Sequence, residues 1–296
     1  MTTSVTATET TVWAELLGCE VKFYDVGGIR TRVIEAGTGR PIILLHGVSG
    51  SAETWVRNVL PLSAHGRVMA IDMIGHGLTD KPDTNYLIPT FTKHLADFVD
   101  AVVDGPVDLV GQSLGGWVTM RYAIANPDRV RRLANVTGAG LAVQQTKEDL
   151  ERYHADLDQV TTQALQSPTR DSVRKRLEWL FYDPAQVPAE LVEIRYRIFQ
   201  RPDSQAMLGR VLADVIGPAN QRHFIARDEL EVLPVPTLVL WTSHNPTTPW
   251  PEGKAAAEAL PDSRFELFEN CAHWPQFENP DGFNTLLTEF LGERGS

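Results

Sequence analysis

The segment "LVGQSLGGWVTM", residues 109–120, carries the side chain best placed to do chemistry. Ser113 stands between Gly111 and Gly115, with an apolar run before it and a helix-like run after it. Gly-x-Ser-x-Gly between a strand and a helix is typical of a nucleophile elbow, a sharp turn that exposes the serine hydroxyl. The pentapeptide alone also fits a plain glycine-rich turn, so the other residues of the chain decide between the two interpretations. Together with the residues described below, the Gly-x-Ser-x-Gly segment predicts that Ser113 is a catalytic nucleophile.

An oxyanion formed at Ser113 needs preorganised hydrogen-bond donors. The helix expected from Leu114 onward points its free N–H groups and its positive dipole end at this place. A second donor usually comes from the loop after an earlier strand, which here reads "HGVSGSAETW" at residues 46–55. We expect the backbone N–H groups of Leu114 and Val48 to form the oxyanion hole. Three further polar residues of these loops are expected to have structural roles: His46, Asp72 and His76.

A general base is expected on the loop after the last strand, because Ser, acid, His is the chain order that accompanies such an elbow. His273 lies there, in "ENCAHWPQFENP", residues 269–280. The alternative is an imidazole on a surface loop, and His244 is a weaker second candidate for the base. The position of His273 predicts that it removes the proton from Ser113.

The expected acid is missing. The loop after the strand at 237–241 is the usual place for it, and this loop holds Asn245. The segment "NVTGAG", residues 135–140, offers no acid either. A neutral amide can orient His273 but does not offset the charge of an imidazolium, and it can favour the wrong tautomer, at a cost of about 10⁴ in rate in a serine protease. Two explanations stay open: Asn245 belongs to a working triad, or it is an inactivating substitution.

Composition narrows the class of protein. The chain has 296 residues, 43% of them hydrophobic, and a formal net charge of −11. Nucleic-acid binding is not expected, because phosphate contacts need clustered Lys and Arg. The chain has two cysteines, and residues 1–11 show no signal peptide, which predicts a cytoplasmic protein. No apolar run approaches ~18 residues in length, so we do not expect the protein to enter a membrane.

Short apolar runs alternate with helical stretches, which predicts parallel βαβ units and the α/β class. The expected strands are at 19–26, 29–37, 41–47, 67–73, 106–112, 130–138, 235–242 and 263–269. From about Leu141 to Asn220 only amphipathic helical patterns occur, with prolines between them. We therefore expect a core of 1–140 and 221–296 with a helical cap, 141–220, inserted over the carboxyl ends of the strands, where α/β sheets bind ligands.

Taken together, these residues resemble the α/β-hydrolase fold family, and within it the meta-cleavage-product hydrolases, which cut a carbon–carbon bond. The segment "CAHWPQFENPDGFNTLLTEFLG", residues 271–292, is similar to that family's Cys-Gly-His-Trp-x-Gln-x-Glu pattern and closing helix. The segment "RNVLPL", residues 57–62, also matches. Arg195, in "ELVEIRY", stands where the cap of that family presents an arginine to a substrate carboxylate.

Three positions depart from the family pattern. The loop "GVSGS", residues 47–51, replaces Gly-Gly-Gly-Pro-Gly, and Gln112 replaces an asparagine before the serine. Asn245 replaces the aspartate of a Gly-x-x-Asp-x-x-x-Pro loop.

The resemblance implies hydrolysis of a 2-hydroxy-6-oxo-hexa-2,4-dienoate from aromatic ring fission, without a cofactor or a metal. Ser113 or water would attack the C6 ketone, His273 would move protons, and Arg195 would hold the carboxylate. Gln112 and Trp274 would line the substrate site. The partner would be a small organic acid, and the sequence leaves a homo-oligomer open.

Two other functions remain open. One is a carboxylesterase or lactonase of small apolar esters with the same residues, and the other is a non-catalytic, ligand-binding relative, which the missing acid permits. Dehalogenase and epoxide-hydrolase chemistry is disfavoured, because those enzymes use a carboxylate nucleophile and position 113 is serine.

Overall fold

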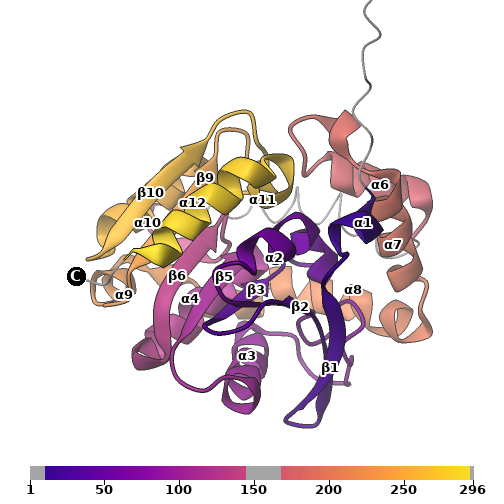
Figure 1. Ribbon diagram of the computed structural model, residues 1–296, viewed down its shortest axis with the longest axis horizontal. Coiled ribbons are helices and arrows are strands. Elements are labelled where there is room, and N and C mark those ends of the chain that lie inside the picture. Colours follow the sequence, from indigo (N-terminus) through magenta and orange to yellow (C-terminus); the bar gives the residue numbers. More distant parts are fainter. Residues whose placement is uncertain (1–10, 145–167, 294–296) are drawn as a thin grey trace, which may run out of the picture.

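The computed structural model describes residues 11–144 and 168–293. Its centre is an eight-stranded sheet in the order β1-β2-β4-β3-β5-β6-β9-β10 (Figure 1). The strands are β1 (Glu20–Val26), β2 (Ile29–Ala36), β3 (Pro41–Leu45), β4 (Arg67–Ile71), β5 (Val107–Gln112), β6 (Val130–Val136), β9 (Thr237–Thr242) and β10 (Ser263–Phe268). The predicted strands are all present, within two residues at each end, and the predicted α/β class is confirmed.

The sheet is antiparallel at one edge and parallel elsewhere. β1 pairs with β2, and β2 with β4, in antiparallel register, whereas the pairs from β4 to β10 are parallel. Gly27 and Gly28 join β1 to β2 with φ of 58° and 83°. Two consecutive residues with positive φ are what a tight hairpin turn requires, so glycine at both positions permits the edge hairpin.

Helices cover both faces of the sheet, because the central strands are apolar on both sides. Ile42 and Leu44 of β3 point into the core beneath α2 and α12, while Ile43 and Leu45 point into the core beneath α3, α4 and α10. Figure 1 shows α2 and α12 in front of the sheet. These helices are α2 (Val56–Leu62), α3 (Ile88–Val102), α4 (Leu114–Ala125), α10 (Trp250–Ala259) and α12 (Pro280–Gly292).

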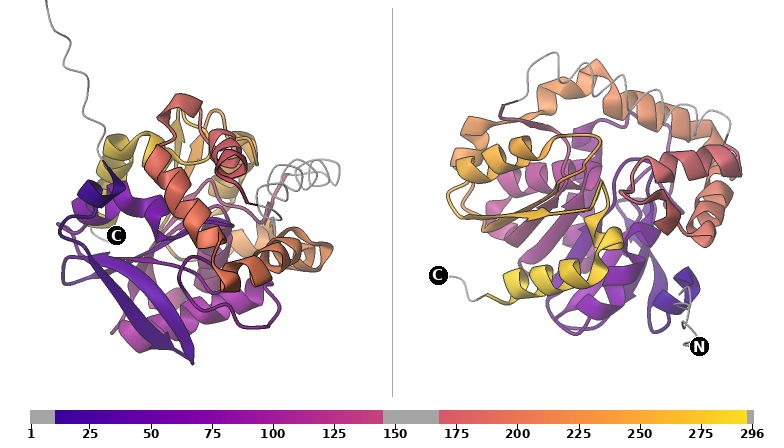
Figure 2. Two further views of the ribbon diagram at one scale, coloured as in Figure 1. Left: turned by 90° about the vertical axis from the view of Figure 1, so that its right-hand side faces the viewer. Right: turned by 90° about the horizontal axis from the view of Figure 1, so that it is seen from above.

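Between β6 and β9 the described residues are mainly helical, with α6 (Arg170–Glu178), α7 (Ala189–Phe199) and α8 (Pro202–Ile216). α6 begins at a reciprocal cap, in which the Thr169 and Ser172 side chains each accept a hydrogen bond from the other's backbone N–H, at 3.0 Å. Figure 2 shows α6, α7 and α8 together beside one end of the sheet. The predicted helical pattern at 147–160 lies outside the described residues.

The structure also contains elements that the pattern of the sequence did not predict. β7 (Leu141–Ala142) pairs in parallel with β8 (Ile225–Ala226). β7 lies at the start of the segment 141–220, where only helices were expected, and β8 lies just after that segment, where no strand was predicted. The two strands are too short to show an alternating pattern. The short helices α1 (Val12–Glu15), α9 (Arg227–Glu231) and α11 (Pro275–Glu278) were not expected either. In the part of the chain that the structure describes, no helix is long and apolar enough to cross a membrane.

Candidate active site

Ser113 lies at the strained turn between β5 and α4. Its φ and ψ are 54° and −117°, a backbone conformation that residues other than glycine rarely adopt. A Cβ on Gly115 would come within 2.3 Å of the Leu45 carbonyl oxygen, and one on Gly111 within 2.3 Å of the Gly115 carbonyl oxygen. Both glycines are therefore required by close approach of the backbone. This geometry is that of a nucleophile elbow.

The two proposed oxyanion donors come from separate loops, since Val48 follows β3 and Leu114 follows Ser113 at the start of α4. Val48 and Ser113 line the same pocket. Leu114 is the first residue of α4, so its N–H has no partner within the helix. Within the described residues, the Val48 N–H donates no hydrogen bond. Both backbone groups are thus available to a ligand.

His273 lies in the same pocket as Ser113 and is bound to Asn245. The His273 Nδ1 is 2.8 Å from the Asn245 Oδ1. The orientation of the amide follows from its other contacts, because Asn245 Nδ2 donates to the Thr248 carbonyl oxygen at 2.8 Å and Oδ1 accepts from the Thr247 hydroxyl at 3.0 Å. Oδ1 therefore accepts from Nδ1–H of His273, and Nε2 is left as the basic nitrogen.

This arrangement answers the concern about the wrong tautomer, since the amide presents its oxygen and not its nitrogen to His273. No hydrogen bond joins Ser113 to His273 in the described parts of the chain. Burial, together with the positive charge of Arg176, lowers the pKa of His273 to about 3. His273 is thus a neutral base over the ordinary pH range, and its imidazolium lacks a negative partner at position 245.

The loop that carries His273 is fixed through its backbone. The His273 carbonyl oxygen accepts hydrogen bonds from Gln112 Nε2 at 3.1 Å and from the Thr137 hydroxyl at 3.0 Å. Glu278 accepts from the N–H groups of Ala272 and Trp274. Gln112 also lines the pocket, and its buried Oε1 has no hydrogen-bond partner within the described residues.

Arg195, the arginine expected to hold a substrate carboxylate, projects from α7 into this pocket. Its side chain is buried and its guanidinium lies 4.8 Å from the centre of the Trp274 ring. Burial and then the charge of Arg176 lower the pKa of Arg195 to about 9. Trp274 is buried as well and forms part of the pocket wall.

Arg176 of α6 lines the pocket too, and the sequence analysis missed it. It is 5% exposed. Helical periodicity in the sequence could have identified it. One buried face of the helix recurs at the expected intervals, and all of its residues are buried: Val173, Arg176, Leu177 and Leu180. One arginine on an otherwise apolar face marks a side chain that points inward.

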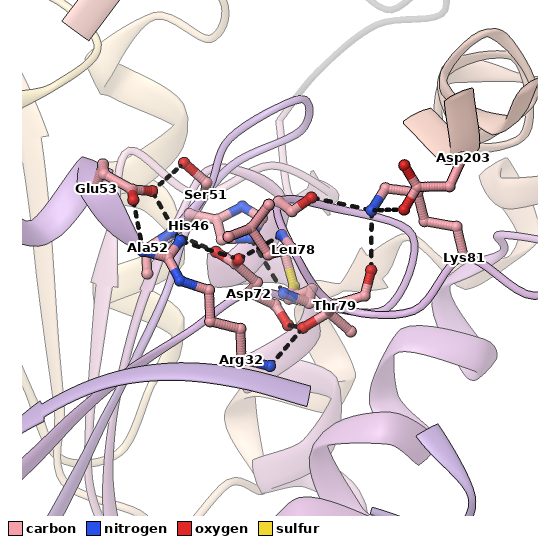
Figure 3. A network of polar contacts seen from close by, with 12 residues as sticks. Arg32, His46, Ser51, Ala52, Glu53, Asp72, Leu78, Thr79, Lys81 and Asp203 are labelled. Atoms are coloured by element: carbon pink, nitrogen blue, oxygen red, sulfur yellow. Dashed lines mark hydrogen bonds and ion pairs between the residues drawn. The ribbon is translucent and has the colours of Figure 1, made fainter. Parts of the chain in front are cut away.

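The loop at residues 46–55, which carries the proposed donor Val48, is called the oxyanion loop here. It contacts a buried charged network, the Arg32 network, formed by Arg32, Glu53 and Asp72 (Figure 3). Arg32 donates to Glu53 at 2.6 and 3.2 Å and to Asp72 at 3.3 Å. Asp72 also accepts from the backbone N–H groups of Ala52 and Leu78 at 2.6 and 2.7 Å. The expectation that Asp72 holds the neighbouring loop thus agrees with its contacts.

His46 ties the oxyanion loop to the same region. Its Nδ1–H donates to the Gly47 carbonyl oxygen at 2.7 Å, and its Nε2 accepts from the Met73 N–H at 3.1 Å. Burial lowers its pKa to about 4. His76 packs beside it, with ring centres 5.1 Å apart. Neither histidine lines the pocket, which fits the structural roles expected of them.

Comparisons with known proteins agree with this geometry. Residues 40–280 match the family described as alpha/beta hydrolase fold. The chain belongs to the α/β-hydrolase family. Since its relatives are hydrolases, the prediction of an enzyme of this class is confirmed.

The resemblance to the meta-cleavage-product hydrolases is also confirmed. A 2-hydroxy-6-oxo-2,4-heptadienoate hydrolase of Pseudomonas putida is 31% identical over 274 residues, 90% of this chain and 94% of the relative. The meta-cleavage product hydrolase of Pseudomonas fluorescens IP01 has a TM-score of 0.78 at 26% identity, over 93% of this chain and 98% of the other. A serine hydrolase involved in carbazole degradation has a TM-score of 0.81 at 26% identity, over 93% and 100%.

Proposed function

We propose that the chain hydrolyses the C5–C6 bond of a 2-hydroxy-6-oxo-hexa-2,4-dienoate, acting on this small organic acid in the cytoplasm. The observation that carries the proposal is the single pocket shared by Ser113, His273 and the buried Arg195. A nucleophile, a base and a cation in one pocket suit an anionic substrate with an electrophilic carbonyl. The names of the relatives, which include 2-hydroxymuconate semialdehyde hydrolases, support the substrate class.

In the proposed reaction the dienol is first converted to its keto form, which places an electron sink beside the scissile bond. Ser113 Oγ, or a water in its place, adds to C6, and His273 Nε2 takes the proton. The N–H groups of Val48 and Leu114 hold the oxyanion. When the C5–C6 bond breaks, its electron pair goes to the carboxylate-bearing fragment, which is protonated on carbon; water then releases any acyl group from Ser113.

Arg195 would bind the substrate carboxylate and fix its orientation, with Trp274 and Gln112 as pocket walls. The contacts of α6 and α7 with the pocket support the proposal that 141–220 acts as a cap over the carboxyl ends of the strands. The backbone N–H of His273 donates to the Leu180 carbonyl oxygen at 2.9 Å, which joins this segment to the loop that carries His273.

An esterase of small apolar esters is the second candidate. Asn245 favours it, because acyl esters have better leaving groups than a carbanion and demand less of the base. Stopped-flow absorbance with 6-methyl and 6-phenyl dienoates, beside 4-nitrophenyl acetate and butyrate, separates the two functions. Faster turnover of a dienoate supports the C–C hydrolase; turnover of esters alone contradicts it. Binding without turnover of either class, even in Asn245→Asp, would indicate a non-catalytic relative.

A further inference from the structure

Gln112, the last residue of β5, lies directly before Ser113 and lines the pocket that holds it. Its side chain is fully buried. The Gln112 Nε2 donates to the His273 carbonyl oxygen at 3.1 Å and to the Thr137 hydroxyl at 3.4 Å. Because a carbonyl oxygen only accepts hydrogen bonds, the nitrogen end of the amide must face His273. The orientation of the amide thus follows from its contacts, and Oε1 faces away from His273.

The Gln112 Oε1 borders the same small space as the Ser113 hydroxyl. A Cβ on Gly47 would stand 2.6 Å from Gln112 Oε1 and 3.4 Å from Ser113 Oγ. A side chain at position 47 would cover this acceptor, and glycine leaves it uncovered. Within the described residues, Oε1 accepts no hydrogen bond. A buried oxygen without a donor is costly to the folded protein, so a ligand that brings a donor would complete it.

Acceptors are few among the side chains that line this pocket. Its arginines and its tryptophan carry donors only. The Thr247 hydroxyl is engaged with Asn245, since it donates to Asn245 Oδ1 at 3.0 Å. The other acceptor atoms on the described side chains of the pocket are Ser113 Oγ, His273 Nε2 and Gln112 Oε1. The first is the proposed nucleophile and the second is the proposed base, so the third remains for another donor.

We propose that Gln112 Oε1 positions the water that attacks the reacting carbonyl carbon. This rests on the proposed function, in which Ser113 and His273 act on such a carbon. A water molecule has two O–H groups, and His273 Nε2 accepts only one of them. A second acceptor is needed, because a buried water with an unbound O–H loses a hydrogen bond that it had in solvent. With both O–H groups bound, a lone pair of the water is aimed at the carbon.

The water has the same role in both routes of the proposed reaction. With an acyl group on Ser113, the water oxygen bonds to the acyl carbon while one proton goes to His273 Nε2. The other O–H stays bound to Gln112 Oε1. The bond between the carbon and Ser113 Oγ then breaks, Oγ takes the proton from His273, and a carboxylic acid is released. A water that attacks C6 directly makes the same two hydrogen bonds.

Methanol distinguishes this role from general support of the site, because methanol has a single O–H group. That group binds to His273, so in the wild type the methyl group lies against the unpaired Gln112 Oε1. Turnover of 4-nitrophenyl butyrate in dilute aqueous methanol gives butyric acid from water and methyl butyrate from methanol. We expect Gln112→Met to raise the ratio of methyl butyrate to butyric acid about tenfold, the effect of one buried hydrogen bond. Gas chromatography of the products measures this ratio.

Thr137→Val is the matched control. The Thr137 hydroxyl donates to the same His273 carbonyl oxygen, at 3.0 Å, but Thr137 is not among the described residues that line the pocket. Loosening the loop of His273 slows both nucleophiles, since both depend on this base, so the product ratio should change less than about threefold. The ratio does not depend on the amount of folded enzyme, and Gln112→Leu serves as a second apolar variant if Gln112→Met does not fold.

An unchanged ratio in Gln112→Met, or an equal rise in Thr137→Val, would overturn the proposal. The butyrate ester carries no hydrogen-bond donor, so a rise in the ratio cannot come from a lost contact between Gln112 and a substrate hydroxyl. With a 6-phenyl dienoate the products to compare are methyl benzoate and benzoic acid.

The outcome for Gln112 is separable from that of the proposed function. An enzyme that cleaves no dienoate, yet shows the shifted ratio with the butyrate ester, refutes the C–C activity and supports the role of Gln112. A dienoate hydrolase with an unshifted ratio retains the C–C activity and refutes the role of Gln112. A chain that cleaves neither substrate refutes both.

Discussion

Buried arginines of this protein occur in two contrasting settings. Arg32 is surrounded by acceptors, with Glu53 and Asp72 both within hydrogen-bond distance. Burial opposes its charge, but the two carboxylates outweigh that effect and raise the pKa of Arg32. Arg195 is equally buried, yet no carboxylate pairs with it among residues 11–144 and 168–293, and its pKa is lowered to about 9. It faces the pocket and the ring of Trp274.

The difference distinguishes a buried arginine that stabilises the fold, Arg32, from one that is available to bind a ligand, Arg195. A buried cation with a complete set of partners fixes the backbone around it, and here the Arg32 network holds the loops behind the oxyanion donors (Figure 3). A buried cation without a carboxylate partner costs stability and is retained where a ligand completes it. Changes in the pocket should therefore alter rate and selectivity, and changes in the Arg32 network should alter stability.

The largest effect on rate is expected from Ser113→Ala. Turnover should fall about 10³-fold or more, because the reacting atom is removed while the residues that hold the substrate remain. Stability should be unchanged or higher, since the strained backbone at position 113 gains nothing from the hydroxyl. Single-turnover kinetics with thermal denaturation measure both. Retention of more than about a tenth of the wild-type rate would require attack from another site or by water alone.

Arg32→Met tests whether the Arg32 network stabilises the fold. It leaves Glu53 and Asp72 buried without their cation, so we expect the free energy of unfolding to fall by about 3–5 kcal/mol. Urea denaturation followed by fluorescence measures this. Arg30→Met, at a neighbouring exposed position, is the control and should cost less than about 1 kcal/mol. Equal costs for the two variants would mean that the Arg32 network does not stabilise the fold.

Arg195→Gln should affect selectivity and leave stability intact. For a desolvated ion pair with the substrate, kcat/KM for carboxylate-bearing substrates should fall by the equivalent of about 2–5 kcal/mol relative to neutral esters. The midpoint of denaturation should stay the same or rise, because an uncompensated buried charge is removed. Equal losses on acids and neutral esters would contradict the carboxylate contact.

Sequence reasoning located the parts of the site whose signals are local. The glycines around Ser113 belong to a five-residue pattern that is evident from the sequence, although the Leu45 carbonyl oxygen that requires Gly115 is distant in the chain. His273 follows from chain order after the last strand. Arg195 came from the resemblance of its short segment to a family pattern. Asn245 could be placed, but the direction of its amide could not, because that depends on the Thr247 and Thr248 backbone and side-chain contacts.

The rest depends on contacts between distant parts of the chain. Arg176 stands among Arg174 and Lys175, and only the packing of α6 decides which of the three points inward. The Arg32 network joins residues 21 and 40 positions apart, and no local pattern pairs a strand arginine with those carboxylates. Charged residues usually lie on the surface, so burial of these groups is evident only from the folded chain.

The smallest expected effect concerns Asn245. Arg32 is paired with two carboxylates, whereas His273 is paired with the neutral amide of Asn245. In Asn245→Asp a carboxylate would face His273 Nδ1 in place of the amide oxygen now 2.8 Å away. An opposite charge favours the protonated imidazole, so the pKa of His273 should rise from about 3. Asn245→Ala is the companion variant and should slow turnover, since it removes the group that orients the ring.

The same charge stabilises the imidazolium formed when Ser113 loses its proton, so we expect Asn245→Asp to hydrolyse neutral esters at least tenfold faster near pH 8. Since the base must be unprotonated, the fall of kcat/KM on acidification should move to higher pH in this variant, whereas the wild type should stay active down to about pH 4. A pH profile of kcat/KM measures both effects. An unchanged or lower rate with the fold intact would mean that Asn245 is a working member of the triad. His273 would then act with an amide partner, as in Cys-His-Asn proteases, and the charge of the bound substrate would have to supply what the missing acid does not.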